Sequence, residues 1–247
     1  MLRVSIFKHN AEITDQWLLQ KVALGADAID FGRDADMPGV TEQGYPDLDA
    51  VRALRRRVRS FGIDINRVTL PTLTHTFIDE RVGAEDELNN AAKALEVYGQ
   101  ARIPIARQRV EGDVFPQMME QYRTKHRGGY LARAESLVQG HPEIPSRAEL
   151  ERWWDRFCVA FERLTPIAEE YDIKLAVHPS DTPNIDTPFG GIGFHRIIDA
   201  FPSPNVGFSG YINPDHIPDL PGDNETSDVG WAYSIGYLKA LFAAAVA

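Results

Sequence analysis

The sequence predicts an α/β fold in which parallel strands form a (β/α) barrel. Strand and helix patterns alternate along most of the 247 residues. Each connection between successive strands is long enough for a helix, which a parallel pairing requires. A doubly wound sheet would need a glycine-rich turn after its first strand, and Lys8-His9-Asn10-Ala11 is not such a turn. We therefore expect a barrel, built as one domain over residues 1–247.

Short runs rich in apolar residues mark the strands of this barrel. They lie near residues 3–7, 28–32, 64–70, 103–109, 174–178 and 205–209. Thr14 and Asp47 are placed to cap the first two helices, and Gly25 and Gly62 to end them. A third helix is expected over residues 85–98, where one face is apolar.

Residues 111–145 interrupt this alternation, because they show no sustained helical or strand period. A long insertion of this kind usually covers a functional site. Ser146 and Glu149 have the spacing of a capping box, which predicts the start of a long helix. The last helix is expected to run from about Val229 to the end of the chain.

The formal net charge of −10 argues against a nucleic-acid partner, because phosphate contacts need a clustered basic surface. The arginines between Arg52 and Arg59 alternate with apolar residues at helical spacing. This run is typical of the solvated face of an amphipathic helix.

The single cysteine, Cys158, excludes an internal disulfide and suits a reducing compartment. Its helical surroundings favour a buried structural thiol over a nucleophile. Residues 1–7 resemble a strand rather than a secretory leader, and no apolar run is long enough to span a membrane. We expect a cytoplasmic protein without a membrane partner.

Polar residues follow or end several predicted strands, and in a barrel they would converge at one mouth. These residues are Lys8, His9, Asp30, Arg107, Arg109, His178 and Asp181. His178 ends an apolar strand and precedes Pro179, a position suited to a divalent-metal ligand. On pattern alone, a hydrogen-bonded core histidine explains His178 equally well.

The loop Asn213-Pro214-Asp215-His216 places a carboxylate next to an imidazole. Such a pair offers an oxygen ligand for a metal and a proton donor or acceptor beside it. An Asx turn with an exposed histidine is the commoner explanation of such a loop, so both interpretations stay open.

Several segments resemble the mannonate dehydratases, a family within the xylose-isomerase-like TIM barrels. They are residues 160–183, which end in Val177-His178-Pro179-Ser180-Asp181, the run Arg127-Gly128-Gly129-Tyr130, the loop over residues 32–47, Pro214-Asp215-His216 and residues 235–241. Together they touch most of the chain in the same order as in the family.

The resemblance implies a metal-dependent lyase that removes water from D-mannonate to give 2-keto-3-deoxygluconate, typically with Mn²⁺. It implies that His178 and Asp215 bind the metal, that Ser209 stands at the family's cysteine ligand, and that His216 transfers a proton. Arg107, Arg109 and Arg127 are expected to bind the sugar acid, because guanidinium groups hold carboxylates in a bidentate manner.

The sequence departs from the family at two points. Ser209 is a much poorer ligand than a thiolate. The predicted sixth strand runs almost directly into Asn213-Pro214-Asp215-His216, so two βα units of about 30 residues each are missing around strands 7 and 8. We therefore expect an incomplete barrel with unpaired edges on strands one and six, a homodimer across the gap, and weak catalysis or none.

Two other functions remain open. A sugar isomerase or epimerase of the same superfamily is disfavoured, because no glutamate stands at the end of the fifth predicted strand. The missing ligands favour a catalytically impaired relative that only binds sugars.

Overall fold

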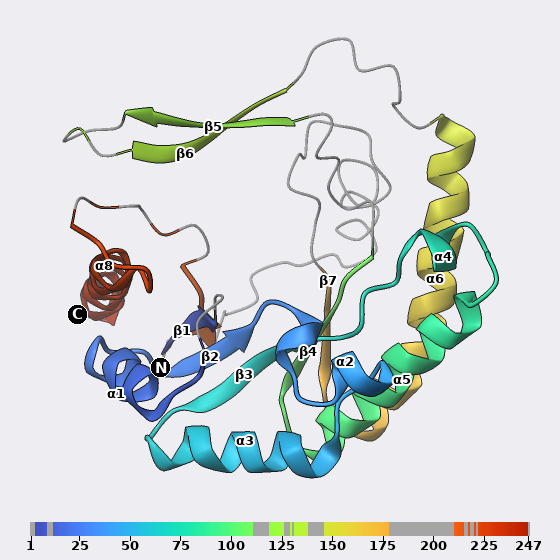
Figure 1. Ribbon diagram of the computed structural model, residues 1–247, viewed down its shortest axis with the longest axis horizontal. Coiled ribbons are helices and arrows are strands. Elements are labelled where there is room, and N and C mark those ends of the chain that lie inside the picture. Colours follow the sequence, from blue (N-terminus) through green and yellow to red (C-terminus); the bar gives the residue numbers. More distant parts are fainter. Residues whose placement is uncertain are drawn as a thin grey trace.

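In the computed structural model, the described residues are 3–8, 12–110, 119–125, 129, 131–137, 146–177, 210–214, 217, 220 and 222–246. Six strands form one sheet, and their bounds are β1 (Arg3–Lys8), β2 (Ala28–Phe31), β3 (Asp64–Thr69), β4 (Ile105–Gln108), β7 (Lys174–Val177) and β8 (Tyr211–Ile212). Figure 1 shows these strands surrounded by helices on their outer side.

The strand order in this sheet is β7-β4-β3-β2-β1-β8, and every neighbouring pair is parallel. From β1 to β7 the strands follow the order of the chain, without the reversal that marks a doubly wound sheet. The last strand, β8, returns to lie beside β1, as the closing strand of a barrel does. The predicted (β/α) barrel is confirmed, and the described strands form an incomplete barrel wall.

One expectation about this wall is wrong. β1 does not have an unpaired edge, because β8 pairs with it through Arg3↔Tyr211 and Val4↔Ile212. The predicted strand at residues 205–209 lies outside the described residues. The strand that directly precedes Asn213 occupies the last position of the barrel, although it is only the sixth strand of the sheet along the chain.

Five long helices accompany the sheet: α1 (Asp15–Ala23), α3 (Leu48–Ser60), α5 (Ala84–Gln100), α6 (Arg147–Glu170) and α8 (Asp228–Val246). Shorter turns of helix are η1 (Asp34–Asp36), α2 (Val40–Gln43) and α4 (His75–Ile78). The predicted caps are confirmed: Thr14 accepts a hydrogen bond from the Trp17 amide, and Asp47 accepts one from the Ala50 amide. None of the described helices has the length and apolarity needed to cross a membrane.

The core lies between the sheet and these helices. Strand residues such as Val4, Ile6, Ile29 and Phe31 are fully buried there. Gly99 in α5 lies against Tyr171, the first residue after α6, and an added Cβ at Gly99 would lie 2.4 Å from Cβ of Tyr171. The absence of a side chain at Gly99 therefore allows the chain at the end of α6 to pack closely against α5.

The insertion at residues 111–145 contains an antiparallel hairpin that the sequence did not predict. Its strands are β5 (Met119–Lys125) and β6 (Leu131–Leu137), paired from Met119↔Leu137 to Lys125↔Leu131. The segments are rich in charged and polar residues, so the apolar pattern that identifies a buried strand is missing. In Figure 1 the hairpin lies apart from the six-stranded sheet.

Candidate active site at the carboxyl ends of the strands

The predicted site residues are described by the structure only in part. Arg107 lies in β4 and Arg109 directly follows this strand, so both stand at its carboxyl end as predicted. The other predicted residues lie outside the described part of the chain: His9, Arg127, His178, Asp181, Ser209, Asp215 and His216. Their roles in binding and catalysis stay predictions.

The ends of β7 and β8 connect these predicted residues to the described sheet. β7 ends at Val177, and His178 is the next residue in the sequence. β8 ends at Ile212, three positions before Asp215. Because all six strands are parallel, their carboxyl ends lie on one side of the sheet. Both chain segments therefore leave the sheet on the side where Arg107 lies.

Asp30 forms the centre of a buried hydrogen-bond network inside the wall. Its side chain accepts hydrogen bonds from Ser5 Oγ at 2.8 Å, Asn66 Nδ2 at 2.7 Å and Asn213 Nδ2 at 2.7 Å. The residue is 2% exposed. A buried carboxylate is costly unless it is hydrogen-bonded, and here three donors surround it. The network joins β1, β2, β3 and the segment after β8.

A β-bulge explains how β3 supplies two neighbouring residues to this network. The pairing between β2 and β3 runs from Ile29↔Ile65 to Asp30↔Arg67, so Asn66 is the extra residue. Asn66 donates to Asp30, while Arg67 Nε lies 3.9 Å from Asp30 Oδ2. Sequence reasoning named Asp30 but missed Asn66 and Arg67, since strict alternation would send them to opposite faces.

Arg67 is a cation held against an aromatic ring. Its guanidinium carbon lies 4.8 Å from the centre of the Phe7 ring, within the range of a cation–π interaction. Its Nε and Nη2 atoms are buried and have no hydrogen-bond partner in the described structure. The nearest carboxylate, that of Asp30, is beyond hydrogen-bond distance. The interior thus combines a hydrogen-bonded carboxylate with a cation whose buried Nε and Nη2 donors have no partner among the described residues.

Arg107 has a structural role in addition to the predicted role in substrate binding. Its Nη2 donates to the Gly32 carbonyl at 2.8 Å and lies 3.3 Å from Thr69 Oγ1. Thr69 Oγ1 in turn donates to the Phe31 carbonyl at 3.0 Å. These bonds connect the carboxyl ends of β2, β3 and β4. Arg107 Nη2 therefore already bonds to the backbone and side chain at the carboxyl ends of neighbouring strands.

Asp36 is a further acidic residue with a buried side chain, and it pairs with Lys8 at the carboxyl end of β1. Its Oδ1 lies 2.5 Å from Lys8 Nζ and 3.0 Å from Arg33 Nη2, and its side chain is 4% exposed. The sequence singled out Lys8 but gave no signal for Asp36. Within the described residues, no three His, Cys, Asp or Glu side chains gather in a way that could hold a metal. A metal centre would therefore require residues such as His178 and Asp215.

Comparisons with known proteins also point to the segment that contains His178. A sequence model of the D-mannonate dehydratase family matches residues 130–203, which include His178. The structure of mannonate dehydratase from Streptococcus suis serotype 2 aligns with a TM-score of 0.61 at 16% identity. The resemblance to the mannonate dehydratase family is confirmed. The alignment covers 82% of this chain and 62% of the Streptococcus enzyme, so this chain spans about three fifths of that protein's length.

A second structure supports the wider fold assignment. A proposed xylose isomerase from Rhodospirillum rubrum aligns with a TM-score of 0.51 at 11% identity, over 97% of this chain and 99% of that one. At this identity the similarity concerns the fold, which is a xylose-isomerase-like barrel. No curated protein sequence matches the chain significantly.

Proposed function

We propose that this chain is a mannonate dehydratase-like hydro-lyase that acts on D-mannonate or a related sugar acid and forms 2-keto-3-deoxygluconate. The observation that carries this proposal is the family match over residues 130–203. The matched segment contains His178, the residue for which the sequence pattern alone left two interpretations open. The parallel barrel wall supports the proposal, because it places the carboxyl ends of β4, β7 and β8 on the same side of the sheet.

The proposed cofactor is a divalent metal ion, with Mn²⁺ as the best candidate. His178 and Asp215 would supply an imidazole and a carboxylate, which suit this ion, whereas the Ser209 hydroxyl suits it poorly. The donor set therefore fits only in part. When bound, the cation would acidify the proton next to the substrate's carboxylate. His216 would donate a proton to the departing hydroxyl.

The sugar acid would be bound by Arg107, Arg109 and Arg127. Arg107 is 8% exposed and lies at the carboxyl end of β4. Because its Nη2 also holds Gly32, it would meet a carboxylate in a fixed orientation, which favours binding. We further propose that the chain forms a homodimer in the cytoplasm, across the gap that the described strands leave between β7 and β8.

A catalytically impaired sugar-binding relative is the second candidate. It is favoured by Ser209 at the expected thiolate position, because a hydroxyl is a much poorer metal ligand than a thiolate. An isomerase or epimerase of the same superfamily would differ in its product, since it would interconvert sugars without losing water.

The decisive experiment is turnover of D-mannonate by the purified chain with added Mn²⁺, followed by detection of the 2-keto-3-deoxy product. We expect slow turnover that increases about tenfold or more in Ser209→Cys, because a thiolate binds the metal more tightly. His178→Ala should remove the residual activity. A folded chain that yields no keto-deoxy acid from a panel of hexonates, even as Ser209→Cys, would favour the sugar-binding relative. Aldose–ketose conversion or epimerisation would instead identify an isomerase.

A further inference from the structure

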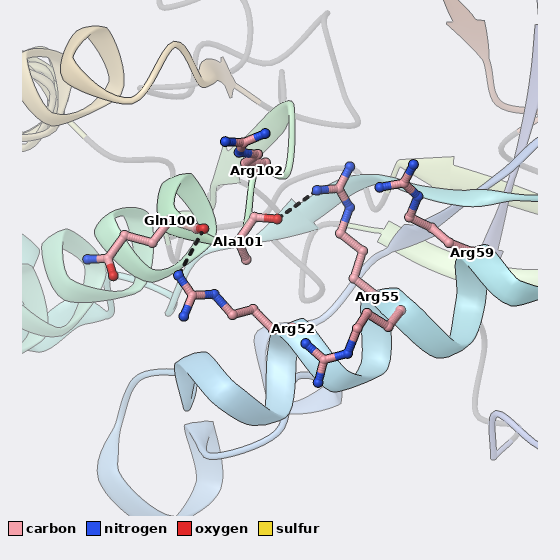
Figure 2. Close-up of a pocket in the computed structure, with 7 residues that line it drawn as sticks. Arg52, Arg55, Arg59, Gln100, Ala101 and Arg102 are labelled. Carbon is pink, nitrogen blue, oxygen red and sulfur yellow. Dashed lines mark hydrogen bonds between the residues drawn. The ribbon is translucent and has the colours of Figure 1, made fainter.

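A cavity of about 270 Å³ lies at the opposite end of the sheet from the candidate active site. Its lining consists of Arg52, Arg55, Arg56, Arg59, Gln100, Ala101 and Arg102. We refer to it as the arginine pocket (Figure 2). Four of these arginines belong to α3, which leads into the start of β3. The remaining lining residues, Gln100, Ala101 and Arg102, lie at the end of α5 and in the turn that leads into β4.

Two of the arginines fix the geometry of the pocket. Arg55 makes a bidentate pair with Asp64, with Nε–Oδ1 and Nη2–Oδ2 distances of 2.9 Å, and its Nη1 donates to the Ala101 carbonyl at 2.7 Å. Arg52 Nη2 reaches the Gln100 carbonyl at 3.5 Å. Figure 2 shows both side chains extending from α3 to the end of α5. They offset the negative partial charge of the last α5 carbonyls, which would otherwise repel an anion.

The other three arginines provide charge that the surrounding residues do not balance. Arg59 is 63% exposed and lies 3.7 Å from Asp64 Oδ2, an oxygen that Arg55 already uses. Arg56 and Arg102 are exposed, and in the described structure their guanidinium groups have neither an ion pair nor a hydrogen bond. Five arginines therefore face two paired carboxylates, Asp64 and Asp49, which leaves a formal excess of three positive charges.

We propose that the arginine pocket binds a small oxyanion carrying two or more negative charges. Guanidinium groups match the oxygens of phosphoryl and carboxylate groups in a planar, bidentate geometry. An ion of this class would offset the repulsion between neighbouring arginines, in a chain whose overall net charge of −10 otherwise repels anions. The ligand differs from the proposed substrate, because a sugar acid such as mannonate carries only one carboxylate.

Binding can be measured by isothermal titration calorimetry of the full chain at low ionic strength, with pyrophosphate and with citrate as probes. We expect saturable binding of at least one probe. The key variant is Arg102→Gly, since Arg102 has a φ of +58° and glycine adopts this conformation without strain. Arg102→Gly should weaken binding about tenfold, corresponding to about 1.4 kcal/mol, while thermal stability is kept or increased.

A second variant and a control separate the pocket from general surface charge. Arg56→Ala lies on an exposed face of α3 and should weaken binding about fivefold without loss of stability. Arg57→Ala removes the same charge from the same helix, but Arg57 pairs with Asp15 at 2.7 Å and does not line the pocket. Its affinity should stay within about twofold of the parent chain.

The two probes distinguish the chemical sources of the anion. Tighter binding of pyrophosphate would assign a phosphorylated ligand, and tighter binding of citrate a polycarboxylate. Absence of saturable binding for both probes would overturn the proposal, as would equal losses in Arg57→Ala and Arg102→Gly. The assay does not depend on lyase turnover, so its outcome is independent of the proposed function.

Discussion

Asn213 Nδ2 donates a hydrogen bond to Asp30 Oδ2 at 2.7 Å, joining two residues that are 183 positions apart in the chain. Asp30 lies in β2, whereas Asn213 directly follows β8, the strand that occupies the closing position of the barrel. The bond therefore anchors Asn213, which lies two and three positions before Asp215 and His216, the residues with predicted roles in metal binding and proton transfer. It also makes Asp30 a contact point between the first and last parts of the barrel wall.

Replacing Asp30 with asparagine should destabilise the fold by about 2–3 kcal/mol, because an amide would face three side chains that donate to this position. Urea unfolding monitored by tryptophan fluorescence measures the change. Asp15→Asn is the matched control, since Asp15 is 69% exposed and its pair with Arg57 contributes at most about 1 kcal/mol. Equal losses in the two variants would show that the Asp30 network does not stabilise the wall.

A buried ion pair connects α1 to the start of α8. Lys21 Nζ, whose side chain is 1% exposed, donates to Asp228, and Gln20 donates to the same carboxylate. Burial by itself raises the pKa of Asp228. Hydrogen bonds from Asn224, Lys21 and Thr226, together with the charge of Lys21, outweigh burial and hold this pKa below its ordinary value of 3.8. The ionised form of Asp228 is therefore favoured by folding.

Because the folded pKa is the lower one, Asp228 stabilises the protein above pH 3.8, and this contribution is lost as the pH falls through the folded pKa. Lys21→Met should destabilise the chain by about 2–3 kcal/mol at pH 7, by leaving a mostly buried carboxylate without its cation. The loss should shrink as the pH falls below 3.8. Urea unfolding of both proteins between neutral and acidic pH measures it, and a loss that does not change with pH would contradict the argument.

The close contact between Gly99 and Tyr171 predicts opposite effects for alanine substitutions at two glycines in helices. Gly99→Ala should destabilise the fold by about 1–3 kcal/mol, because the new Cβ would lie 2.4 Å from Cβ of Tyr171. Gly236→Ala, in α8, meets nothing within 4 Å and should stabilise by up to about 1 kcal/mol. Thermal unfolding of the two variants should therefore shift in opposite directions. A shift in the same direction would show that the packing at Gly99 is looser than described.

The predicted metal site can be tested separately from catalysis. His178→Ala should abolish binding of Mn²⁺ in isothermal titration, because the imidazole of His178, the next residue in the sequence after β7, is the strongest proposed ligand. Cys158→Ala should leave binding intact, since Cys158 belongs to helix α6 and does not follow a strand. Circular dichroism spectra must show that both variants are folded. Equal loss of binding in the two variants would exclude the proposed role of His178.

The sequence by itself determined the elements whose signals are local. The caps at Thr14 and Asp47 depend on residues three positions away, and the apolar period of α5 depends on its own turns. The order of strands and helices also favoured a parallel barrel, because parallel strands require helical connections. The hairpin β5–β6 was missed, since its polar strands carry no apolar alternation.

Only the tertiary structure decided which distant segments meet. It placed β8 beside β1, joined Asn213 to Asp30, and brought Asn66 and Arg67 to one carboxylate through a bulge. It also separated the arginines of α3: Arg55 is largely covered, with 17% of its side chain exposed, whereas Arg57 turns outward to Asp15. Pairing across the barrel depends on how the chain closes in space, and the local periods of a sequence carry no information about that closure.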